Sequence, residues 1–95
     1  MSWAVSGGRH AISAFVYILG TETPSGLWRT YVGWTNDLDR RLAAHNRGTG
    51  ARSTRGRKWI LLYVERYDDK RQAMSREWRV KRDRRLRRAV TPGPF

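Results

Sequence analysis

The chain has 95 residues, no cysteine, and 20 Lys and Arg against 8 Asp and Glu, which leaves a formal net charge of +12. This length suits one domain with a thin core, and the lack of cysteine excludes disulfides, zinc knuckles and a cysteine nucleophile. So positive a chain is typical of proteins that bind nucleic acid, and no apolar run reaches the length of a membrane span. We therefore expect a cytoplasmic, nucleoid-associated protein that binds no membrane.

The first part of the chain predicts a tail and two strands. Residues 1–10 are small and polar, which is typical of a flexible N-terminal tail. Residues 14–19 and 28–34 are rich in aromatic and β-branched side chains, as strands are. The turn between them contains Gly, Pro, Ser and Thr, so we expect an antiparallel hairpin with a long loop.

The next part predicts a helix, a basic loop and a third strand. Asn36 is a natural N-cap, and Gly48 marks the end of this helix. Residues 48–58 form a loop that is rich in arginine and glycine. Residues 59–67 form the strongest strand of the chain.

The last part predicts one long helix, from about Lys70 to Val90, and a C-terminal tail over residues 91–95. The expected order is therefore β-β-α-β-α. We expect an α+β fold in which a small three-stranded, mostly antiparallel sheet is flanked by helices, in a single domain over residues 11–90.

Candidate functional residues begin with a pair on the first helix. Arg41 and His45 are four residues apart, so they share a face beside the apolar positions Leu38 and Leu42. Tyr31, on the second strand, can approach this face. The ordinary explanation is that such an Arg and His are solvated and that strand tyrosines only pack in the core.

Glu77 is an acid inside the most basic stretch of the chain. It follows Ala73 by four residues and Met74 by three, so we expect it on or beside an apolar stripe that also includes Trp78 and Val80. Such a glutamate usually offsets repulsion between nearby arginines on its helix. As a functional residue, it would be a metal ligand at the edge of the core.

Together these positions resemble the GIY-YIG nucleases, specifically the small single-domain bacterial type. Tyr17, in Phe15-Val16-Tyr17, matches the tyrosine of the first motif, and Tyr31-Val32-Gly33 matches the second. Arg41 and His45 match the arginine and the histidine of the family, and Glu77 matches its metal-binding glutamate. The five positions occur in the family's order and on the expected elements.

The resemblance runs from about residue 15 to residue 88, with two departures from the family pattern. The first motif has Phe-Val-Tyr where the family name gives Gly-Ile-Tyr, which leaves the tyrosine intact. Some members also carry a catalytic asparagine on or after the last helix, whereas this chain has none beyond Asn46. Lys81 stands where small stand-alone relatives often have a lysine after the glutamate.

The resemblance implies a metal-dependent endonuclease that hydrolyses phosphodiester bonds in structured or single-stranded DNA, in repair or recombination. It implies one divalent ion, Mg²⁺ or Mn²⁺, held by Glu77, and no small-molecule cofactor. A single well-placed carboxylate suits Mg²⁺, which keeps waters and phosphate oxygens as its other ligands. The competing hypothesis is a non-catalytic DNA- or RNA-binding module that keeps the fold.

The catalytic roles that the resemblance implies leave the general base open. Arg41 would stabilise negative charge on the phosphate in the transition state. Tyr17 would be the base if Arg41 and the metal lower its pKa, whereas His45 has a more convenient ordinary pKa. Tyr31 would help to position the attacking water.

We expect the substrate to be held through its phosphates, because the chain contains no motif that reads bases. The partner would be DNA, with RNA as the alternative. The residues expected to contact it lie in the basic loop and on the last helix: Arg52, Arg55, Arg57, Lys58, Arg76, Arg79, Lys81 and Arg84.

Overall fold

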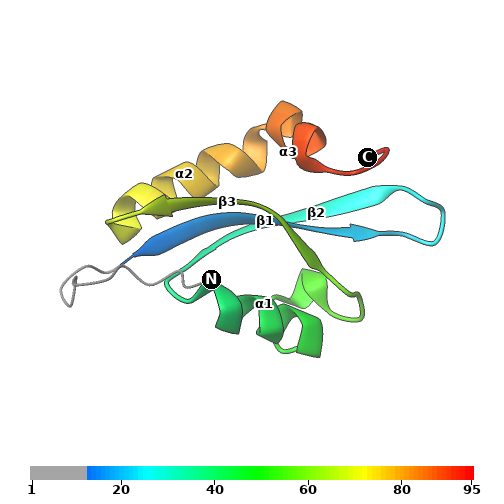
Figure 1. The fold of residues 1–95 in the computed structure, drawn as a ribbon, viewed down its shortest axis with the longest axis horizontal. Helices are drawn as coiled ribbons and strands as arrows, with labels where there is room; N and C mark the ends of the chain where they lie inside the picture. The colour runs from blue at the N-terminus through cyan, green and yellow to red at the C-terminus, as the bar shows by residue number, and fades with distance from the viewer. Residues whose placement is uncertain (1–12) are drawn as a thin grey trace.

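In the computed structural model, which describes residues 13–95, a three-stranded sheet lies between two helical layers (Figure 1). Helix α1 covers one face of the sheet, and α2 and α3 cover the other (Figure 1). The elements are β1 (Ala14–Glu22), β2 (Trp28–Thr35), α1 (Leu38–Arg47), the 3-10 turn η1 (Arg52–Thr54), β3 (Ile60–Tyr67), α2 (Lys70–Arg82) and α3 (Arg84–Val90).

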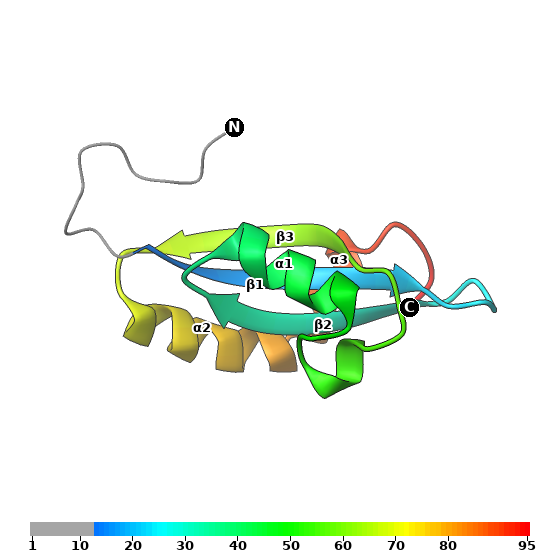
Figure 2. The ribbon, with the colours of Figure 1, turned by 90° about the horizontal axis from the view of Figure 1, so that it is seen from below.

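The strand order is β2-β1-β3, and both pairs are antiparallel (Figure 2). The expected α+β fold is therefore confirmed. The expected N-terminal tail, residues 1–10, lies outside the described residues. Within the described residues, no helix combines the length and the apolar character that a membrane crossing requires.

Strand β1 is buried almost throughout because it is the central strand and both of its faces are covered. Successive side chains of a strand point to opposite faces. Val16 and Ile18 consequently pack towards α2, whereas Phe15, Tyr17 and Leu19 pack towards α1. This explains the continuous apolar run in the sequence, and it places Tyr17 on the α1 face.

Helix α1 begins one residue later than expected, because its N-cap is Asp37 and not Asn36. The backbone N–H of Asp37 donates to the hydroxyl of Thr35 (3.1 Å), and the Asp37 carboxylate accepts from the backbone N–H of Arg40 (3.1 Å). The helix ends at Gly48, which has a left-handed φ of 79°. Glycine reaches this conformation without steric cost.

The expectation of a single long helix over residues 70–90 is wrong, because the helix is interrupted at Asp83, which separates α2 from α3. The Asp83 carboxylate caps α3 by accepting from the backbone N–H of Leu86 (3.0 Å). Aspartate favours such caps over helix interiors. The break lets Leu86 and Val90 pack on the core cluster beneath α2.

The apolar stripe of α2 also differs from the expected one. Ala73 and Val80 are buried, whereas Met74 and Trp78 are exposed. Spacing in the sequence shows which residues share a face of a helix, but it does not show how wide a strip the sheet covers. Here the covered strip is narrow, since Ala73 and Val80 are the buried residues of α2.

The C-terminal segment, residues 91–95, returns to the sheet edge. The backbone N–H of Trp28 donates to the carbonyl of Pro94 (2.6 Å). The guanidinium carbons of Arg84 and Arg87 lie 5.4 and 5.5 Å from the centre of the Phe95 ring. This segment thereby covers one end of the edge strand β2, where an unpaired backbone would otherwise be exposed.

Candidate active site

A buried chain of hydrogen bonds begins at Tyr17. The Tyr17 hydroxyl lies 2.9 Å from Nε2 of His45, and Nδ1 of His45 lies 2.8 Å from the hydroxyl of Thr54. All three side chains are buried. The Thr54 hydroxyl in turn donates to the carbonyl of Ala51 (2.8 Å).

The last of these bonds determines the direction of the whole chain. A hydroxyl has one proton, and Thr54 uses it on Ala51, so Thr54 must accept from Nδ1–H of His45. Neutral His45 therefore has an unprotonated Nε2, which accepts from the Tyr17 hydroxyl. The proton of Tyr17 already points at a base, and its oxygen keeps lone pairs free for another donor.

Two glycines make room for this arrangement. Gly33 is the register partner of Tyr17 on β2, and a Cβ there would lie 2.5 Å from the Tyr17 hydroxyl oxygen. The Tyr17 ring therefore lies across Gly33 and carries its hydroxyl towards the β2 edge of the sheet. A Cβ at Gly50 would lie 2.7 Å from Nδ1 of His45, so the loop after α1 can close over the imidazole only with glycine here.

Tyr31 and Arg41 complete this side of the site. The Tyr31 ring packs on the imidazole of His45, with centroids 4.8 Å apart, and lies 6.3 Å from the Tyr17 ring. The Tyr17 hydroxyl raises the pKa of Arg41 above its ordinary value, with a smaller contribution from Tyr31, and this outweighs the opposing effect of burial. The guanidinium thus lies beside both tyrosines.

The pKa values of Tyr17 and His45 differ from those expected from the sequence. Burial raises the pKa of Tyr17 to about 12; Arg41 acts to lower it, as expected, but burial outweighs that effect. Burial, and then the charge of Arg41, lowers the pKa of His45 to about 4. At neutral pH Tyr17 is therefore protonated and His45 is neutral, which is the state that the hydrogen bonds require.

Glu77 lies on α2, which covers the other face of the sheet. With Ala73 and Val80 against the sheet, residues 76 and 77 point to opposite flanks of α2, since each residue turns the helix by about 100°. Arg76 pairs with Glu65 on β3, so Glu77 points towards β2. Its charge is the smallest of the causes that raise the pKa of Tyr17, after burial and the charge of Tyr31.

Comparisons with known proteins identify the family of this chain. A family model described as the GIY-YIG catalytic domain matches residues 13–89. The chain belongs to the GIY-YIG family. The resemblance inferred from the sequence is confirmed, and because the GIY-YIG domain is a nuclease fold, the family's substrates are nucleic acids.

Similar proteins occur in bacteria and archaea. A UPF0213 protein of Clostridium perfringens is 46% identical over 69 residues, which cover 72% of this chain and 70% of that protein. A UPF0213 protein of Halobacterium salinarum is 46% identical over 67 residues, which cover 70% of this chain and 82% of that protein. The solution NMR structure of a UPF0213 protein from Bacillus halodurans is 39% identical, covers 82% of this chain and 81% of that chain, and has a TM-score of 0.44.

In this GIY-YIG domain, Glu77 fits the single-carboxylate metal site that the resemblance implies. Its side chain is 20% exposed, and it forms a loose ion pair of 3.6 Å with Nζ of Lys81 on the same helix. Over residues 13–95 there is no group of three or more His, Cys, Asp or Glu that could hold a metal ion. A lone carboxylate can still hold Mg²⁺, which fills its other positions with water and phosphate oxygens.

Glu65 is a second carboxylate that the sequence reasoning missed. It accepts from Nε and Nη2 of Arg76 (2.8 and 3.0 Å), from the Tyr67 hydroxyl (2.6 Å) and from the Tyr63 hydroxyl. Although burial alone would raise the pKa of Glu65, these bonds lower it to about 2. Its oxygens are all engaged, so Glu65 holds α2 against β3 and is no spare metal ligand. Alternating polar residues at 63, 65 and 67 were the available signal.

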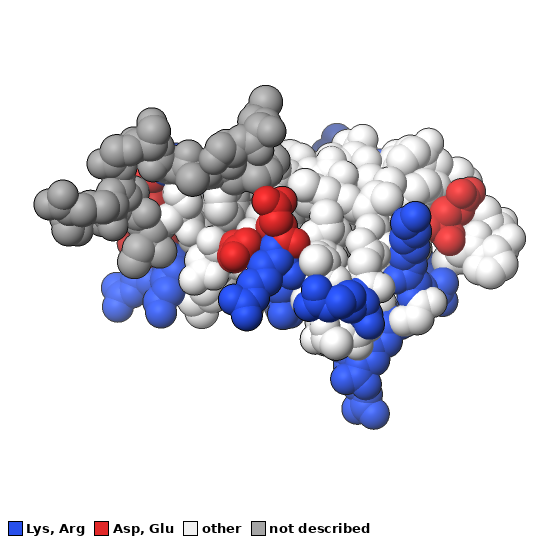
Figure 3. Space-filling model, turned by 60° about the horizontal axis from the view of Figure 1, so that its bottom comes forward, with Lys and Arg blue, Asp and Glu red and all other residues white. Residues whose placement is uncertain are grey.

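This ion pair changes the expectation for Arg76, one of the residues proposed to contact nucleic acid. Its guanidinium is committed to Glu65 through two bonds, so it is poorly available to phosphate. Most of the other expected contact residues are exposed, and Arg57 is half-buried. Lys and Arg side chains gather along one side of the face seen in Figure 3, with a few acidic residues among them.

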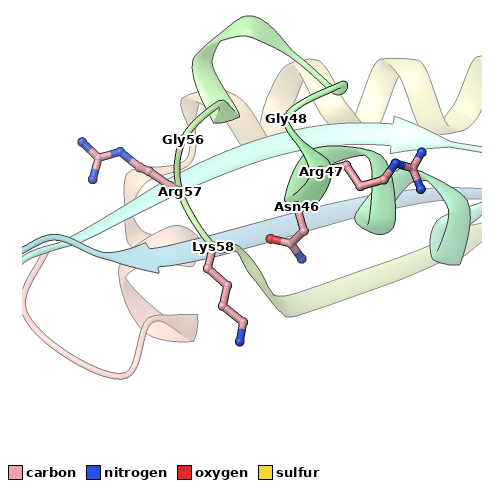
Figure 4. Close-up of a pocket in the computed structure, with 6 residues that line it drawn as sticks. All are labelled: Asn46, Arg47, Gly48, Gly56, Arg57 and Lys58. Atoms are coloured by element: carbon pink, nitrogen blue, oxygen red, sulfur yellow. The ribbon is translucent and has the colours of Figure 1, made fainter.

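The basic loop forms a pocket with the end of α1 (Figure 4). The pocket holds about 470 Å³, and the charged ends of Arg47, Arg57 and Lys58 spread out around it. Arg47 was not among the residues expected from the sequence. The side chain of Asn46 closes the loop by donating to the carbonyl of Trp59 (3.0 Å) and accepting from its backbone N–H (2.6 Å).

A second pocket, of about 330 Å³, adjoins the site at the start of α1. Arg40 and Arg41 line it together with residues 35–37 and Ala44. Two guanidiniums near a helix N-terminus favour an anionic group. A phosphate in this pocket would be next to the Arg41 guanidinium that lies beside the two tyrosines.

Proposed function

We propose that this protein is an endonuclease that depends on a divalent metal and hydrolyses phosphodiester bonds in DNA. The observation that carries the proposal is the directed chain from Tyr17 through His45 to Thr54, next to Arg41 and on the side to which Glu77 points. A DNA-binding module without catalysis would not require a buried proton acceptor at this position. Repair or recombination at the nucleoid, in the cytoplasm, is the proposed setting.

Tyr17 and His45 share the role of general base in this mechanism. The Tyr17 oxygen accepts a proton from the attacking water while the Tyr17 hydroxyl proton passes to Nε2 of His45. His45 becomes the imidazolium, and its Nδ1–H remains bonded to Thr54. The hydroxide attacks the phosphorus, and the bond to the leaving ester oxygen breaks. That oxygen takes up a proton from solvent and the imidazolium later releases its proton to solvent, so charge and protons balance.

Arg41 links substrate binding to this proton transfer. Its charge is one cause of the low pKa of His45, after burial. A phosphate that binds Arg41 offsets that charge, which raises the basicity of His45 when the substrate is in place. The same guanidinium stabilises the charge that develops on the phosphate in the transition state.

Glu77 would hold the metal, Mg²⁺ or Mn²⁺. The ion, when bound, supplies a Lewis acid for the phosphate and for the leaving oxygen. Glu77 must exchange its loose contact with Lys81 for the ion, and Lys81 is then free to bind a substrate phosphate. Tyr31 keeps the plane of His45 fixed by packing on it and helps to position the attacking water.

A cleavage assay on supercoiled plasmid, single-stranded DNA and branched DNA tests the proposal. With Mg²⁺ or Mn²⁺, we expect cutting by the wild type that EDTA stops. Glu77→Gln and Arg41→Ala should lower the rate by roughly 100-fold or more, the scale of losing an electrostatic group in an active site, while DNA binding remains.

Asp39→Asn is the matched control, because Asp39 is an exposed carboxylate on α1 and its loss changes the charge equally. We expect this variant to cut like the wild type. Cutting by Glu77→Gln at the wild-type rate would show that the activity arises elsewhere. Binding without any cutting would favour the non-catalytic module.

A further inference from the structure

Trp78 is the most exposed of the large apolar residues among those described. It is 59% exposed, and Met74, one turn earlier on α2, is also exposed. Burial of such a side chain is strongly favourable, so an exposed tryptophan beside another apolar residue commonly marks a contact surface.

These two residues lie on the same flank of α2 as Glu77. With Ala73 and Val80 on the sheet and Glu77 turned towards β2, steps of about 100° place Met74 and then Trp78 further round the helix in the same direction. On this flank of α2, Glu77 therefore lies nearest the sheet and Trp78 lies nearest solvent. Trp78 is also the next residue after Glu77 in the chain.

Arg82 orients the indole. Its guanidinium carbon lies 3.9 Å from the centre of the Trp78 ring, and its Nη1 donates to the carbonyl of Trp78 (3.0 Å). A guanidinium stacked on a tryptophan makes a favourable cation–π contact and still carries its charge at the surface. The ring is thus held in place while more than half of the residue faces solvent.

The charges around this apolar pair indicate the chemistry of the partner. Four exposed cations lie on the same part of the helix: Lys70, Arg71, Lys81 and Arg82. An aromatic platform surrounded by cations suits a base, which stacks on the ring, and its phosphates, which meet the charges. An apolar protein surface would leave these cations without partners.

We propose that Trp78, supported by Met74 and Arg82, is a stacking platform for an unpaired base of the DNA strand that enters the site at Glu77. This inference rests on the proposed function, because Glu77 defines where the strand is cut. Bases within a duplex are already stacked and cannot reach the indole. The platform therefore favours substrates that have a single-stranded segment next to the cut phosphate.

Binding in EDTA tests the platform without cleavage. Fluorescence anisotropy would measure the Kd for a labelled single strand and for the blunt duplex that it forms with its complement. Trp78→Leu keeps an apolar side chain but removes the stacking face. We expect it to raise the Kd for the single strand roughly 5-fold or more, the weak end of base–aromatic stacking energies, with the Kd for the duplex unchanged.

Two further variants make the result specific. Trp78→Phe keeps an aromatic ring and should retain most of the single-strand affinity. Leu27→Ala removes another exposed apolar side chain, in the β1–β2 turn, and should change neither Kd. A single-strand affinity that Trp78→Leu leaves unchanged, an equal loss for the duplex, or Phe behaving like Leu would overturn the proposal.

The tryptophan fluorescence adds a direct signature. The part of the emission that Trp78→Phe removes should be quenched by the single strand and not by the duplex. Because these measurements exclude metal, they are independent of cutting. If the wild type shows this quenching but cuts nothing with Mg²⁺ or Mn²⁺, the proposed function fails and the stacking platform stands. If it cuts DNA without the quenching, the proposed function stands and the stacking platform fails.

Discussion

At the scale of single residues, the site depends on Thr54, which belongs to neither motif of the family name. Its hydroxyl donates to Ala51 and thereby accepts from Nδ1–H of His45, which leaves Nε2 for Tyr17. One buried hydroxyl thus decides whether His45 faces the tyrosine as an acceptor or as a donor. Only the acceptor form can take the tyrosine proton.

Thr54→Val tests this role, since valine keeps the shape and removes the hydroxyl. Nitrogen NMR of His45 should show a shift towards the Nε2–H tautomer, because Nδ1–H would have no acceptor. We expect the free energy of unfolding to fall by about 1–3 kcal/mol, the cost of an unsatisfied buried polar group. Thr54→Ser should restore the Nδ1–H tautomer; a tautomer that is unchanged in Thr54→Val would contradict the assignment.

At the scale of elements, the site depends on how the two strands of the hairpin pair. Tyr17 and Gly33 face each other in the register, so the tyrosine ring can cross the edge strand only where no side chain stands. Glycine is therefore required at position 33 for packing, because it leaves room for the Tyr17 ring to reach the edge of the sheet.

We expect Gly33→Ala to displace the Tyr17 ring, because the new Cβ would lie 2.5 Å from the hydroxyl oxygen. Stability should fall by about 1–3 kcal/mol, as for other overpacked sites, and the His45 nitrogen signals should show loss of the Tyr17 bond. Gly26→Ala is the comparison: nothing lies within 4 Å there, so it reports only the backbone cost of its φ of 86°. Unchanged His45 signals in Gly33→Ala would show that the ring is not held this way.

Helix α2 is held at the same scale by Glu65, whose pKa falls from its ordinary value of 4.5 to about 2. As the pH falls, Glu65 is therefore protonated in the unfolded chain at a higher pH than in the folded protein. The stabilisation is complete above about pH 4.5 and is lost as the pH falls towards 2. We expect Glu65→Gln to lower the free energy of unfolding by about 2 kcal/mol at pH 7 and to flatten its pH dependence below pH 4.5.

Urea unfolding between pH 2 and pH 7 measures both effects. Asp68→Asn is the matched control, because Asp68 forms an exposed pair with Arg66 at 3.2 Å. Exposed pairs contribute about 0–1 kcal/mol, so this variant should differ little from the wild type. If the two variants had equal stability at pH 7, the ion pair of Arg76 would not be what holds α2.

At the scale of the whole molecule, a net charge of +12 favours binding to the phosphates of nucleic acid, which are the same in every sequence. The basic loop pocket lies on the α1 side of the sheet, and the exposed arginines of α2 and α3 lie on the other side (Figure 1). Affinity that comes from phosphate contacts falls with salt, because binding releases counterions.

We expect the logarithm of the affinity for duplex DNA to fall linearly with the logarithm of the salt concentration. Each of Arg57→Gln and Lys58→Gln should make the slope shallower by about 0.9, the value for one phosphate contact. Arg76→Gln should leave the slope nearly unchanged, since Arg76 is occupied by Glu65. A larger effect from Arg76 than from Lys58 would show that the ion pair opens when DNA binds.

Much of the fold could be predicted because the strands and helices follow from local patterns of apolar residues, caps and turns. The apolar runs around Tyr17 and Tyr31 mark strands, and Gly48 ends α1 where expected. The five candidate site residues could be selected because the motif spacing is preserved. Glu77 was expected on or beside the buried stripe, and it lies half-buried beside Ala73 and Val80 on one flank of α2.

The sequence by itself determined the element types, the net charge and the chemical groups available to a site, because periodicity and composition act along the chain. Only the tertiary structure decided how those groups work. It set the direction of the bond between Tyr17 and His45, the commitment of Arg76 to Glu65, and the exposure of Trp78. Each of these depends on a contact between residues distant in the chain, or on how much of a helix the sheet covers, and local pattern carries neither.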